Sequence, residues 1–367
     1  MKFRCDRDVL SEALQTVQRG VSTRPGIPAL TGVLLSVGEG GLTLVTTDLE
    51  VTTEMRVDVE AQEQGMALVP ARLVADMVKS LAPDAVEFEA DESQARVRCR
   101  SFEGTLRCLA AEDFPSMREP QGVKVTVDAP TFGEAVGQVV KAASRDEARP
   151  ILTGVLLEAN REGVTMVATD SYRLAVRELQ ASGDGEAKTL VPERAITEVG
   201  RAAAAEEKGE VEMVLGDAQA TFRVGSLVLT SRLIEGEFPN YRQLIPEAGG
   251  NRLTAPRQEL LEAVRRVGLL ARENSPVRVE LNALGVRLVS SSPDLGGAVE
   301  ALEAGYEGEE MTAAFNPGYI ADGLTGVVGE RVAIELRDGL KPAVLRGEAD
   351  DAFTYLVMPV RLPAPVG

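Results

Sequence analysis

Histidine is absent from the 367 residues of this chain, and so is tryptophan. Without histidine the chain cannot form Ser-His-Asp or Cys-His nucleophile arrangements, a histidine zinc site or a histidine general base. Its three cysteines, Cys5, Cys99 and Cys108, are an odd number with no CxxC spacing, which indicates neither a disulfide framework nor a zinc knuckle. We therefore expect a protein of the reducing cytoplasm that uses no metal and no other cofactor.

Long hydrophobic runs are also missing. No uninterrupted stretch of ~18 apolar residues occurs, and the first ten residues carry five charges with no apolar segment after them. These features predict a protein that is neither secreted nor membrane-spanning. Aromatic residues make up only 4%, yet the hydrophobic fraction of 44% is enough to build globular cores from valine, leucine, isoleucine and alanine.

Basic residues are outnumbered by acidic ones, 39 to 57, so the formal net charge is −18. Taken alone, this charge argues against a simple basic nucleic-acid-binding protein. No GxxxxGK[ST] loop is present, so the chain is not expected to hydrolyse ATP. The carboxylate pairs Asp48/Glu50 and Asp350/Asp351 are more typical of acidic surface loops than of metal or acid/base chemistry.

A 21-residue segment is repeated along the chain at a spacing of 122 residues. Residues 28–48 read PALTGVLLSVGEGGLTLVTTD and residues 150–170 read PILTGVLLEANREGVTMVATD, with 12 identities and no gap. The same spacing relates the LVP segments that begin at Leu68 and Leu190. A third, more diverged copy contains the segment GVRLVSSS from Gly285, which lies 122 residues after the GVTMVATD from Gly163. Three such units account for the whole chain.

Each unit opens with a stretch of helical periodicity, and in the first of these Val9, Leu10, Leu14 and Val17 fall close to one face. A second, shorter helix follows a proline, and apolar runs bounded by glycine predict strands and hairpins. The predicted longer helices are 7–19, 131–145 and 257–272, and the shorter ones are 71–80, 193–204 and 318–325. The predicted class is α+β, with two helices packed on mostly antiparallel sheet in each unit.

Polar stretches rich in proline and glycine, around 120–122 and 247–250, coincide with the repeat boundaries and are candidate linkers. They predict three domains, at 1–121, 122–248 and 249–367.

Several segments, in order and spacing, resemble the bacterial DNA polymerase III beta subunit family, the replicative sliding clamps. The resemblance covers essentially the whole chain. It rests on the opening MKF, the segment 24–32, ATDSYRLA at 168–175, FPNYR at 238–242 and YLVMPVRL at 355–362.

The resemblance implies a DNA-clamp fold in which two chains associate head to tail into a six-domain ring around duplex DNA. It implies a non-catalytic processivity factor whose partners are the DNA polymerase III alpha subunit, a clamp loader, other proteins with clamp-binding motifs and a second copy of itself. Two alternatives are a clamp paralogue devoted to repair and a carboxylate-based enzyme on a triplicated scaffold. The lack of histidine and of a repeated carboxylate constellation argues against the enzyme.

In such a ring the helices line the hole, and sliding requires a weakly attractive, non-specific lining. The helical stretches 6–19, 71–80, 131–145, 193–204, 256–272 and 317–326 carry a formal net charge of +2, which leaves −20 on the rest. The candidate phosphate contacts are Arg24, Arg72, Lys79, Lys141, Arg145, Arg149, Arg201, Arg265, Arg266 and Arg272. Arg24 and Arg72 match basic lining positions of the family; any of the ten could instead serve a solvated helix face or a local ion pair.

The resemblance also places a pocket for a short, largely apolar partner motif at the junction of the second and third domains. We call the following set the partner pocket: Leu152, Thr169, Tyr172, Arg173, Leu174, Pro239, Leu244, Leu340, Pro342, Val357, Met358, Pro359, Val360, Arg361 and Leu362. Its leucine, valine, methionine and proline side chains suit an apolar ligand. Leu152, Leu174 and Val357 could equally be ordinary core residues.

Three positions depart from the family pattern. Ser171-Tyr172 stands where the best-known members have Gly-His, Gln243 stands where they have arginine, and Pro342 replaces a small polar residue. We therefore expect a pocket of the same kind with altered rim chemistry. The family pattern typically ends at 361–362, and the five residues Pro363 to Gly367 are expected to form a tail beside the pocket mouth.

Overall fold

The computed structural model describes residues 1–21, 26–116, 120–246, 250–271, 276–292 and 294–361. The chain divides into two compact units, one formed by 1–129 with 205–233 and the other by 130–204 with 234–367. Of the residues singled out above, Arg24, Arg272, Leu362 and the tail 363–367 lie outside the described residues.

The first unit combines the first repeat with four strands of the second. Its helices are α1 (Arg7–Gln18) and α2 (Ala71–Ser80), with short 3-10 turns at Pro28–Thr31 and Ala111–Asp113. Its strands are β1 (Lys2–Asp6), β2 (Gly32–Gly38), β3 (Gly41–Thr47), β4 (Val51–Val57), β5 (Glu60–Glu63), β6 (Gly65–Pro70), β7 (Ala85–Ala90), β8 (Gln94–Cys99), β9 (Phe102–Arg107), β10 (Val123–Asp128), β16 (Glu210–Leu215), β17 (Gln219–Val224) and β18 (Leu227–Arg232).

Helix α1 illustrates why the helices form where they do. The Asp6 carboxylate caps it by accepting from the backbone N–H of Asp8 at 2.8 Å. Leu10 and Leu14 are buried in a core that also holds the stacked rings of Phe3 and Phe88, 5.2 Å apart. The prediction that Val9 shares this face is wrong, because 47% of Val9 is exposed. Val9 precedes Leu10 by one residue and is therefore turned by about 100° from the buried stripe.

The second unit holds the remaining helices and strands. Its helices are α3 (Ala129–Val139), α4 (Glu193–Ala205), α5 (Arg257–Gly268) and α6 (Pro317–Gly326), with 3-10 turns η3 (Val140–Ala142), η4 (Pro150–Leu152) and η5 (Tyr241–Gln243). Its strands are β11 (Gly154–Ala159), β12 (Gly163–Thr169), β13 (Arg173–Gln180), β14 (Ser182–Gly183), β15 (Ala187–Pro192), β19 (Asn251–Pro256), β20 (Val277–Asn282), β21 (Gly285–Ser292), β22 (Gly296–Leu302), β23 (Gly305–Glu307), β24 (Met311–Phe315), β25 (Arg331–Leu336), β26 (Ala343–Gly347) and β27 (Asp350–Val357).

The sheets follow the repeat. The first unit contains a sheet of order β5-β1-β7-β8-β9 and strands in the order β6-β2-β3-β4-β18-β17-β16-β10. The second unit contains a nine-stranded sheet, β15-β11-β12-β13-β27-β26-β25-β19-β23, and a four-stranded sheet, β22-β21-β20-β24. β4 pairs with β18 and β13 with β27, both antiparallel, so neighbouring repeats are joined by continuous sheet. The predicted α+β class with mostly antiparallel sheet is confirmed.

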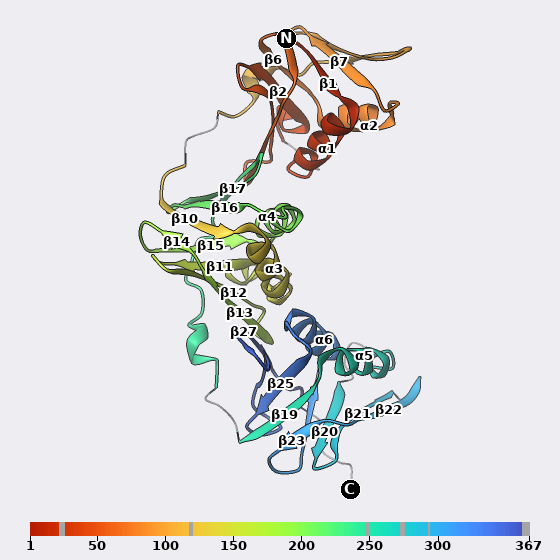
Figure 1. The fold of residues 1–367 in the computed structure, drawn as a ribbon, viewed down its shortest axis with the longest axis vertical. Helices are drawn as coiled ribbons and strands as arrows, with labels where there is room; N and C mark the ends of the chain where they lie inside the picture. Colours follow the sequence, from red (N-terminus) through yellow and green to blue (C-terminus); the bar gives the residue numbers. More distant parts are fainter. Residues whose placement is uncertain (22–25, 117–119, 247–249, 272–275, 293, 362–367) are drawn as a thin grey trace. The chain divides into compact units, whose positions relative to one another are not determined.

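Helix α6 packs on β27 through a glycine. A Cβ on Gly323 would lie 2.5 Å from Cδ1 of Tyr355, so a larger residue cannot occupy this point of the helix without a shift. Figure 1 shows α5 and α6 side by side next to the strands of this unit. The close packing of α6 fixes its residues Tyr319 and Asp322 beside Arg173, the first residue of β13.

Three predicted helices are longer than the observed ones. α3 ends at Val139 and tightens into η3, so Lys141 and Arg145 lie beyond the α-helix, and α5 ends at Gly268. The six helices as observed carry a formal net charge of −1, not +2, because several of the basic residues lie just past helix ends. The helices are still nearly neutral, and −17 remains on the rest of the chain.

Cys5, Cys99 and Cys108 are free cysteines, and the first two are buried. Within the described ranges, no helix has both the length and the apolar character that crossing a membrane requires.

Candidate functional site

A tight turn between β12 and β13 stands at the centre of the candidate site. Oδ1 of Asp170 accepts from the backbone N–H groups of Tyr172, at 2.8 Å, and Arg173, at 2.9 Å. Ser171 has a φ of 78°, a left-handed conformation that favours glycine. This explains in physical terms why the family pattern has glycine where this chain has Ser171. The turn presents Tyr172 outward with 58% of its surface exposed.

The floor next to this turn is apolar. Leu174 lies opposite Leu356 on β27, and Arg173 lies opposite Val357. We call the following residues the pocket-floor cluster: Leu156, Val167, Leu174, Val176, Leu190, Phe238, Tyr241 and Leu356, with Ile151, Ile234 and Ile245 packed against them. The cluster gathers side chains from β11, β12, β13, β15 and β27 and from the segment 234–245, which are far apart in the sequence.

The rim of the floor is formed by exposed apolar side chains. Leu244, Met358 and Val360 are 47%, 38% and 39% exposed. The backbone N–H of Met358 donates to the carbonyl of Tyr172 at 2.8 Å, which fixes the chain where it leaves β27. Buried leucines below exposed methionine, leucine and tyrosine form an adaptable apolar contact surface.

Six of the predicted pocket residues are directly connected in the structure. Thr169, Tyr172, Arg173, Leu174, Val357 and Met358 are joined by strand pairing and hydrogen bonds. Pro239 and Leu244 flank the cluster members Phe238 and Tyr241, and Pro342 precedes Ala343, which pairs with Val357.

The other predicted residues are not members of the pocket-floor cluster. Leu152 is buried in η4, where its carbonyl accepts from the backbone N–H of Ser144. Leu340 is 72% exposed in the turn before β26. The backbone N–H of Val360 donates to the carbonyl of Ala314 on β24, at 2.7 Å. Pro359 is half-buried and Arg361 is exposed.

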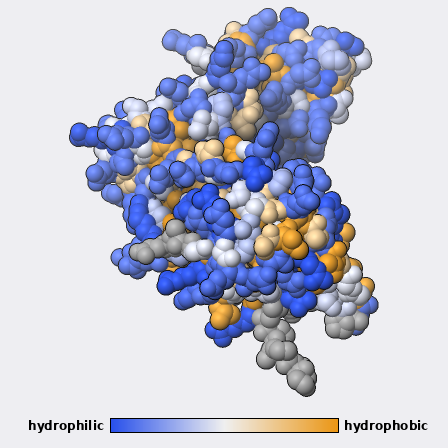
Figure 2. Space-filling model, turned by 60° about the horizontal axis from the view of Figure 1, so that its bottom comes forward, coloured by the Kyte–Doolittle hydropathy of each residue, from blue (hydrophilic) through white to orange (hydrophobic). Residues whose placement is uncertain are grey.

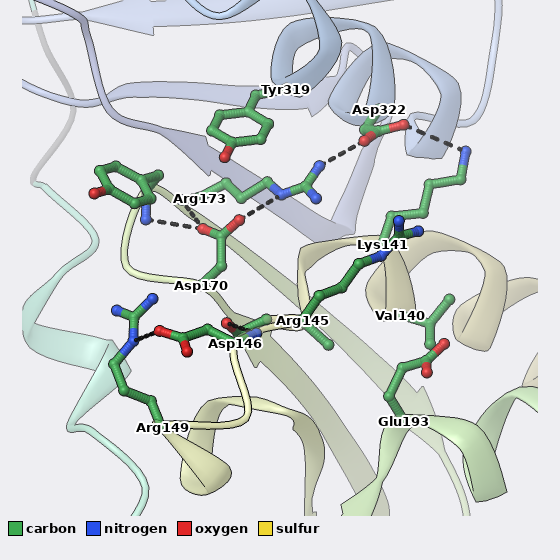
Figure 3. Close-up of a pocket in the computed structure, with 13 residues that line it drawn as sticks. Val140, Lys141, Arg145, Asp146, Arg149, Asp170, Arg173, Glu193, Tyr319 and Asp322 are labelled. Carbon is green, nitrogen blue, oxygen red and sulfur yellow. Dashed lines mark hydrogen bonds and ion pairs between the residues drawn. The ribbon is translucent and has the colours of Figure 1, made fainter. Parts of the chain in front are cut away.

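A cavity of about 690 Å³ adjoins the turn on the side of α6 (Figure 3). At its centre, Arg173 makes ion pairs with Asp170 at 3.0 Å and Asp322 at 2.5 Å. The Arg173 guanidinium lies 4.4 Å from the centre of the Tyr319 ring, which in turn stacks on Tyr172. The lining residues are Val140, Lys141, Ala143, Ser144, Arg145, Asp146, Arg149, Asp170, Tyr172, Arg173, Glu193, Tyr319 and Asp322.

The surroundings of Arg173 keep its guanidinium positively charged. Burial opposes the charge on Arg173, but its interactions with Tyr355, Asp322 and Asp170 outweigh that effect and raise its pKa above the usual range. The Arg173 side chain is only 12% exposed. A charged, largely buried arginine held by two carboxylates ties the 170–173 turn to α6.

The candidate phosphate contacts fall into two groups. Lys141 pairs with Asp322, Arg149 with Asp146, Arg201 with Glu198 and Arg266 with Glu300, at 3.8, 2.9, 2.8 and 2.6 Å. Arg72, Lys79, Arg145 and Arg265 are exposed. Among the described residues, these four make no ion pair within 4 Å.

Sequence reasoning missed several residues of this site. Tyr319 and Asp322 come from the third repeat, about 150 residues away from Arg173, and no motif marks them. Phe238 could have been found, because Phe-Pro is repeated at 114–115 and 238–239, and Tyr241 lies in the FPNYR segment that carries the resemblance. Asp170 is likewise the last residue of the repeated segment, where Asp48 makes the same turn in the first copy.

Comparisons with known proteins agree along the whole chain. Models of the DNA polymerase III beta subunit match in succession, the N-terminal domain at residues 1–118, the central domain at 126–240 and the C-terminal domain at 242–361. The beta sliding clamp of Streptomyces coelicolor is 36% identical over 376 residues, which cover 99% of this chain and 100% of the relative. The beta sliding clamp of Pseudomonas putida is 33% identical over the same shares.

Solved structures give the same result. The Pseudomonas aeruginosa sliding clamp bound to griselimycin superposes with a TM-score of 0.94 at 32% identity, covering 99% of this chain and 100% of that one. The Bacillus subtilis DNA polymerase sliding clamp also has a TM-score of 0.94, at 28% identity and the same coverage.

Three repeated domains of two helices on antiparallel sheet, with an apolar floor at one junction, define a DNA sliding clamp. The chain belongs to the family of the DNA polymerase III beta subunit, the bacterial beta sliding clamps. This family is a non-catalytic processivity subunit of the replicative polymerase. The prediction of the family and of its function is therefore confirmed, and the enzyme alternative is not supported.

Proposed function

We propose that two copies of this chain close head to tail into a ring that encircles duplex DNA without sequence preference. The ring tethers the DNA polymerase III alpha subunit and other motif-bearing proteins through the partner pocket, and a clamp loader opens it. The domains are 1–121, 122–248 and 249–367, and the protein acts in the cytoplasm as the replicative clamp. Whole-length similarity to beta sliding clamps of several bacteria and three free cysteines support this proposal.

The main support for the ring comes from two edge strands whose counterparts in the other repeats are paired. Strands β4, β13 and β22 occupy the same place in the three repeats, as do β9, β18 and β27. β4 pairs with β18 and β13 with β27, which leaves β22 and β9 at the edges of their sheets. By analogy with the β4–β18 and β13–β27 pairs, β22 of one chain pairs with β9 of its partner.

The sheet sizes support this pairing. In the nine-stranded sheet, four strands precede the junction and five follow it. The sheet that ends in β22 has four strands and the sheet that ends in β9 has five, so pairing β22 with β9 would make another sheet of nine strands. Because each chain offers both of these edges, two chains close on themselves, and neither β22 nor β9 is left as an unpaired edge.

The surface near β22 supports the same interface. Val299 on β22 is 57% exposed, whereas Met55 and Arg177, which hold the equivalent places on β4 and β13, are half-buried. Figure 2, which brings the β20–β23 end of the second unit toward the viewer, shows hydrophobic side chains gathered there among hydrophilic ones. A partner strand beside β22 would cover such a surface.

The dimer can be tested with a matched pair of variants. Val299→Glu should give monomers in multi-angle light scattering, because it places a charge on the proposed strand edge. Leu284→Glu should stay dimeric, because Leu284, although 88% exposed, lies in the turn between β20 and β21. A monomeric wild type, or a Val299→Glu variant as dimeric as Leu284→Glu, would refute the interface.

For the partner pocket, griselimycin offers a defined probe, since a solved P. aeruginosa clamp is bound to it. We propose that griselimycin binds this chain at the pocket-floor cluster and its rim. The supporting features are the buried Leu174 and Leu356 and the exposed Leu244 and Met358 above them. Leu244→Asp should abolish griselimycin binding while leaving the dimer intact; unchanged binding would place the ligand elsewhere.

A further inference from the structure

One carboxylate outside the partner pocket gathers the groups that shape the pocket wall. Glu158 lies on β11, and its side chain is 18% exposed. Its Oε2 accepts from the Tyr241 hydroxyl at 2.9 Å and is 2.8 Å from Nη2 of Arg242. Its Oε1 is 3.2 Å from Nζ of Lys188, the residue opposite it on β15. Three donors thus meet on a single, largely buried side chain.

Two of these donors belong to the turn η5, which carries the pocket wall. Tyr241 is only 4% exposed, and its ring is part of the pocket-floor cluster. The guanidinium of Arg242 lies 4.6 Å from the centre of that ring, on its way to Glu158. The backbone N–H of Leu244 donates to the carbonyl of Tyr241 at 2.9 Å. The position of Leu244 therefore depends on where Tyr241 is held.

Leu244 lies at the surface, at the end of a short turn. It is 47% exposed, as befits a residue that would contact a ligand, and the turn that carries it is only three residues long. A turn of that length has almost no stability of its own. An external anchor lowers the conformational entropy that the wall must lose when a ligand binds.

The first junction of the chain supplies an internal comparison. By the 122-residue spacing, Ser36 stands in the place of Glu158 and Met66 in the place of Lys188. The floor differs too, because Thr52 pairs with Thr230 where Leu174 pairs with Leu356. At the first junction, Ser36 and Met66 therefore cannot supply the carboxylate and the ammonium group of this anchor, and the central strand pair carries threonines.

We propose that Glu158 is a positioning residue of the partner pocket, which fixes the 241–244 turn through Tyr241 and Arg242 and so presets the wall formed by Leu244. This inference rests on the proposed function of the pocket. It makes Glu158 a determinant of ligand affinity that does not itself touch the ligand.

The test compares four variants of the full-length protein. Glu158→Ala removes the anchor, Tyr241→Phe removes only the hydroxyl and keeps the ring, and Glu158→Gln keeps an acceptor for that hydroxyl. Lys188→Ala is the matched control, because Lys188 contacts the same carboxylate but not the turn. The first readout needs no ligand: hydrogen exchange at the Leu244 amide should speed up in Glu158→Ala and Tyr241→Phe and stay unchanged in Lys188→Ala.

The second readout is griselimycin binding by surface plasmon resonance. We expect affinity to fall about tenfold in Glu158→Ala and about threefold in Tyr241→Phe, with Glu158→Gln in between and Lys188→Ala within about twofold of wild type. The double variant Glu158→Ala/Tyr241→Phe should bind about as weakly as Glu158→Ala alone, because both changes remove the same anchor. Unfolding temperature and dimer mass are measured in parallel.

The outcomes separate the two proposals. Unchanged exchange at Leu244 in both Glu158→Ala and Tyr241→Phe would overturn the positioning role, whatever griselimycin does. Equal losses in Glu158→Ala and Lys188→Ala would also overturn it, since they would indicate a general charge effect. Wild-type protein that does not bind griselimycin would contradict the proposed pocket, while the exchange result would still decide the role of Glu158.

Discussion

Ser171 adopts a backbone conformation in which glycine is the least strained residue. Its φ of 78° recurs at Leu49, the equivalent place in the first repeat, where φ is 76°. In both turns an aspartate, Asp170 or Asp48, accepts two backbone N–H groups and holds the chain in this shape. The hydrogen bonds of the turn therefore offset a local strain that the side chain brings.

This strain leads to a prediction for the turn. Ser171→Gly should raise the free energy of unfolding by about 1 kcal/mol, and Ser171→Val should lower it by about 1–2 kcal/mol. Ser171→Ala is the control, because it removes the hydroxyl near Arg149 and keeps the unfavourable φ. Urea unfolding followed by circular dichroism measures all three. A gain in Ser171→Ala as large as in Ser171→Gly would show that strain is not the cause.

Arg173 is a largely buried cation that pairs with two carboxylates. Asp170 and Asp322 both pair with it, and its side chain is 12% exposed. Arg173→Ala should lower the free energy of unfolding by about 3 kcal/mol, because a buried pair that loses one partner leaves an uncompensated charge.

Arg149→Ala serves as its control. Arg149 pairs with Asp146, but its side chain is 42% exposed, so the expected loss is below about 1 kcal/mol. Similar losses in the two variants, measured by urea unfolding, would mean that burial does not distinguish these ion pairs.

At the scale of strands, the two junctions between repeats share a topology and differ in chemistry. A groove of about 710 Å³ in the first unit lies over β4, β18 and β17. Its floor contains Thr47 and Thr52, whose hydroxyls are 2.9 Å apart, and Thr221 and Thr230, which are also 2.9 Å apart. These hydroxyls make this part of the floor polar, whereas the matching strand pair of the other junction carries Leu174 and Leu356.

The polar groove predicts the number of ligand sites. Isothermal titration calorimetry should give one griselimycin per chain, bound at the partner pocket. Thr230→Asp, in the polar groove, should leave both stoichiometry and affinity unchanged. Two sites per chain would show that the repeat supplies a second functional pocket in spite of its threonines.

The sequence predicts an element when neighbouring residues determine it, and fails when residues far apart in the chain determine it. The repeat, the proline-preceded helices and the helix α1 follow from local patterns, because periodicity and caps are local properties. The end of α3 at Val139 does not, because helical periodicity continues to Arg145 although the backbone tightens into η3. The pairing of Glu158 with Tyr241 joins residues 83 positions apart and leaves no sequence pattern.

For the whole molecule, the charge balance is informative only when it is divided among the elements. The net charge of −18 argues against DNA, yet the observed helices carry only −1 of it. Acidic strands and loops with nearly neutral helices suit a ring that must encircle a polyanion without gripping it. Family resemblance predicts this arrangement; the sequence alone could not place β9 and β22 as the open edges.

The ring is tested most directly by the topology of DNA retention. Clamps are loaded by a clamp loader onto a nicked circular plasmid, separated from free protein by gel filtration, and the plasmid is then cut once with a restriction enzyme. We predict that the clamp co-elutes with the intact circle and is released when the circle is cut, because an encircling ring slides off an end. Equal retention on circular and cut DNA would contradict the account.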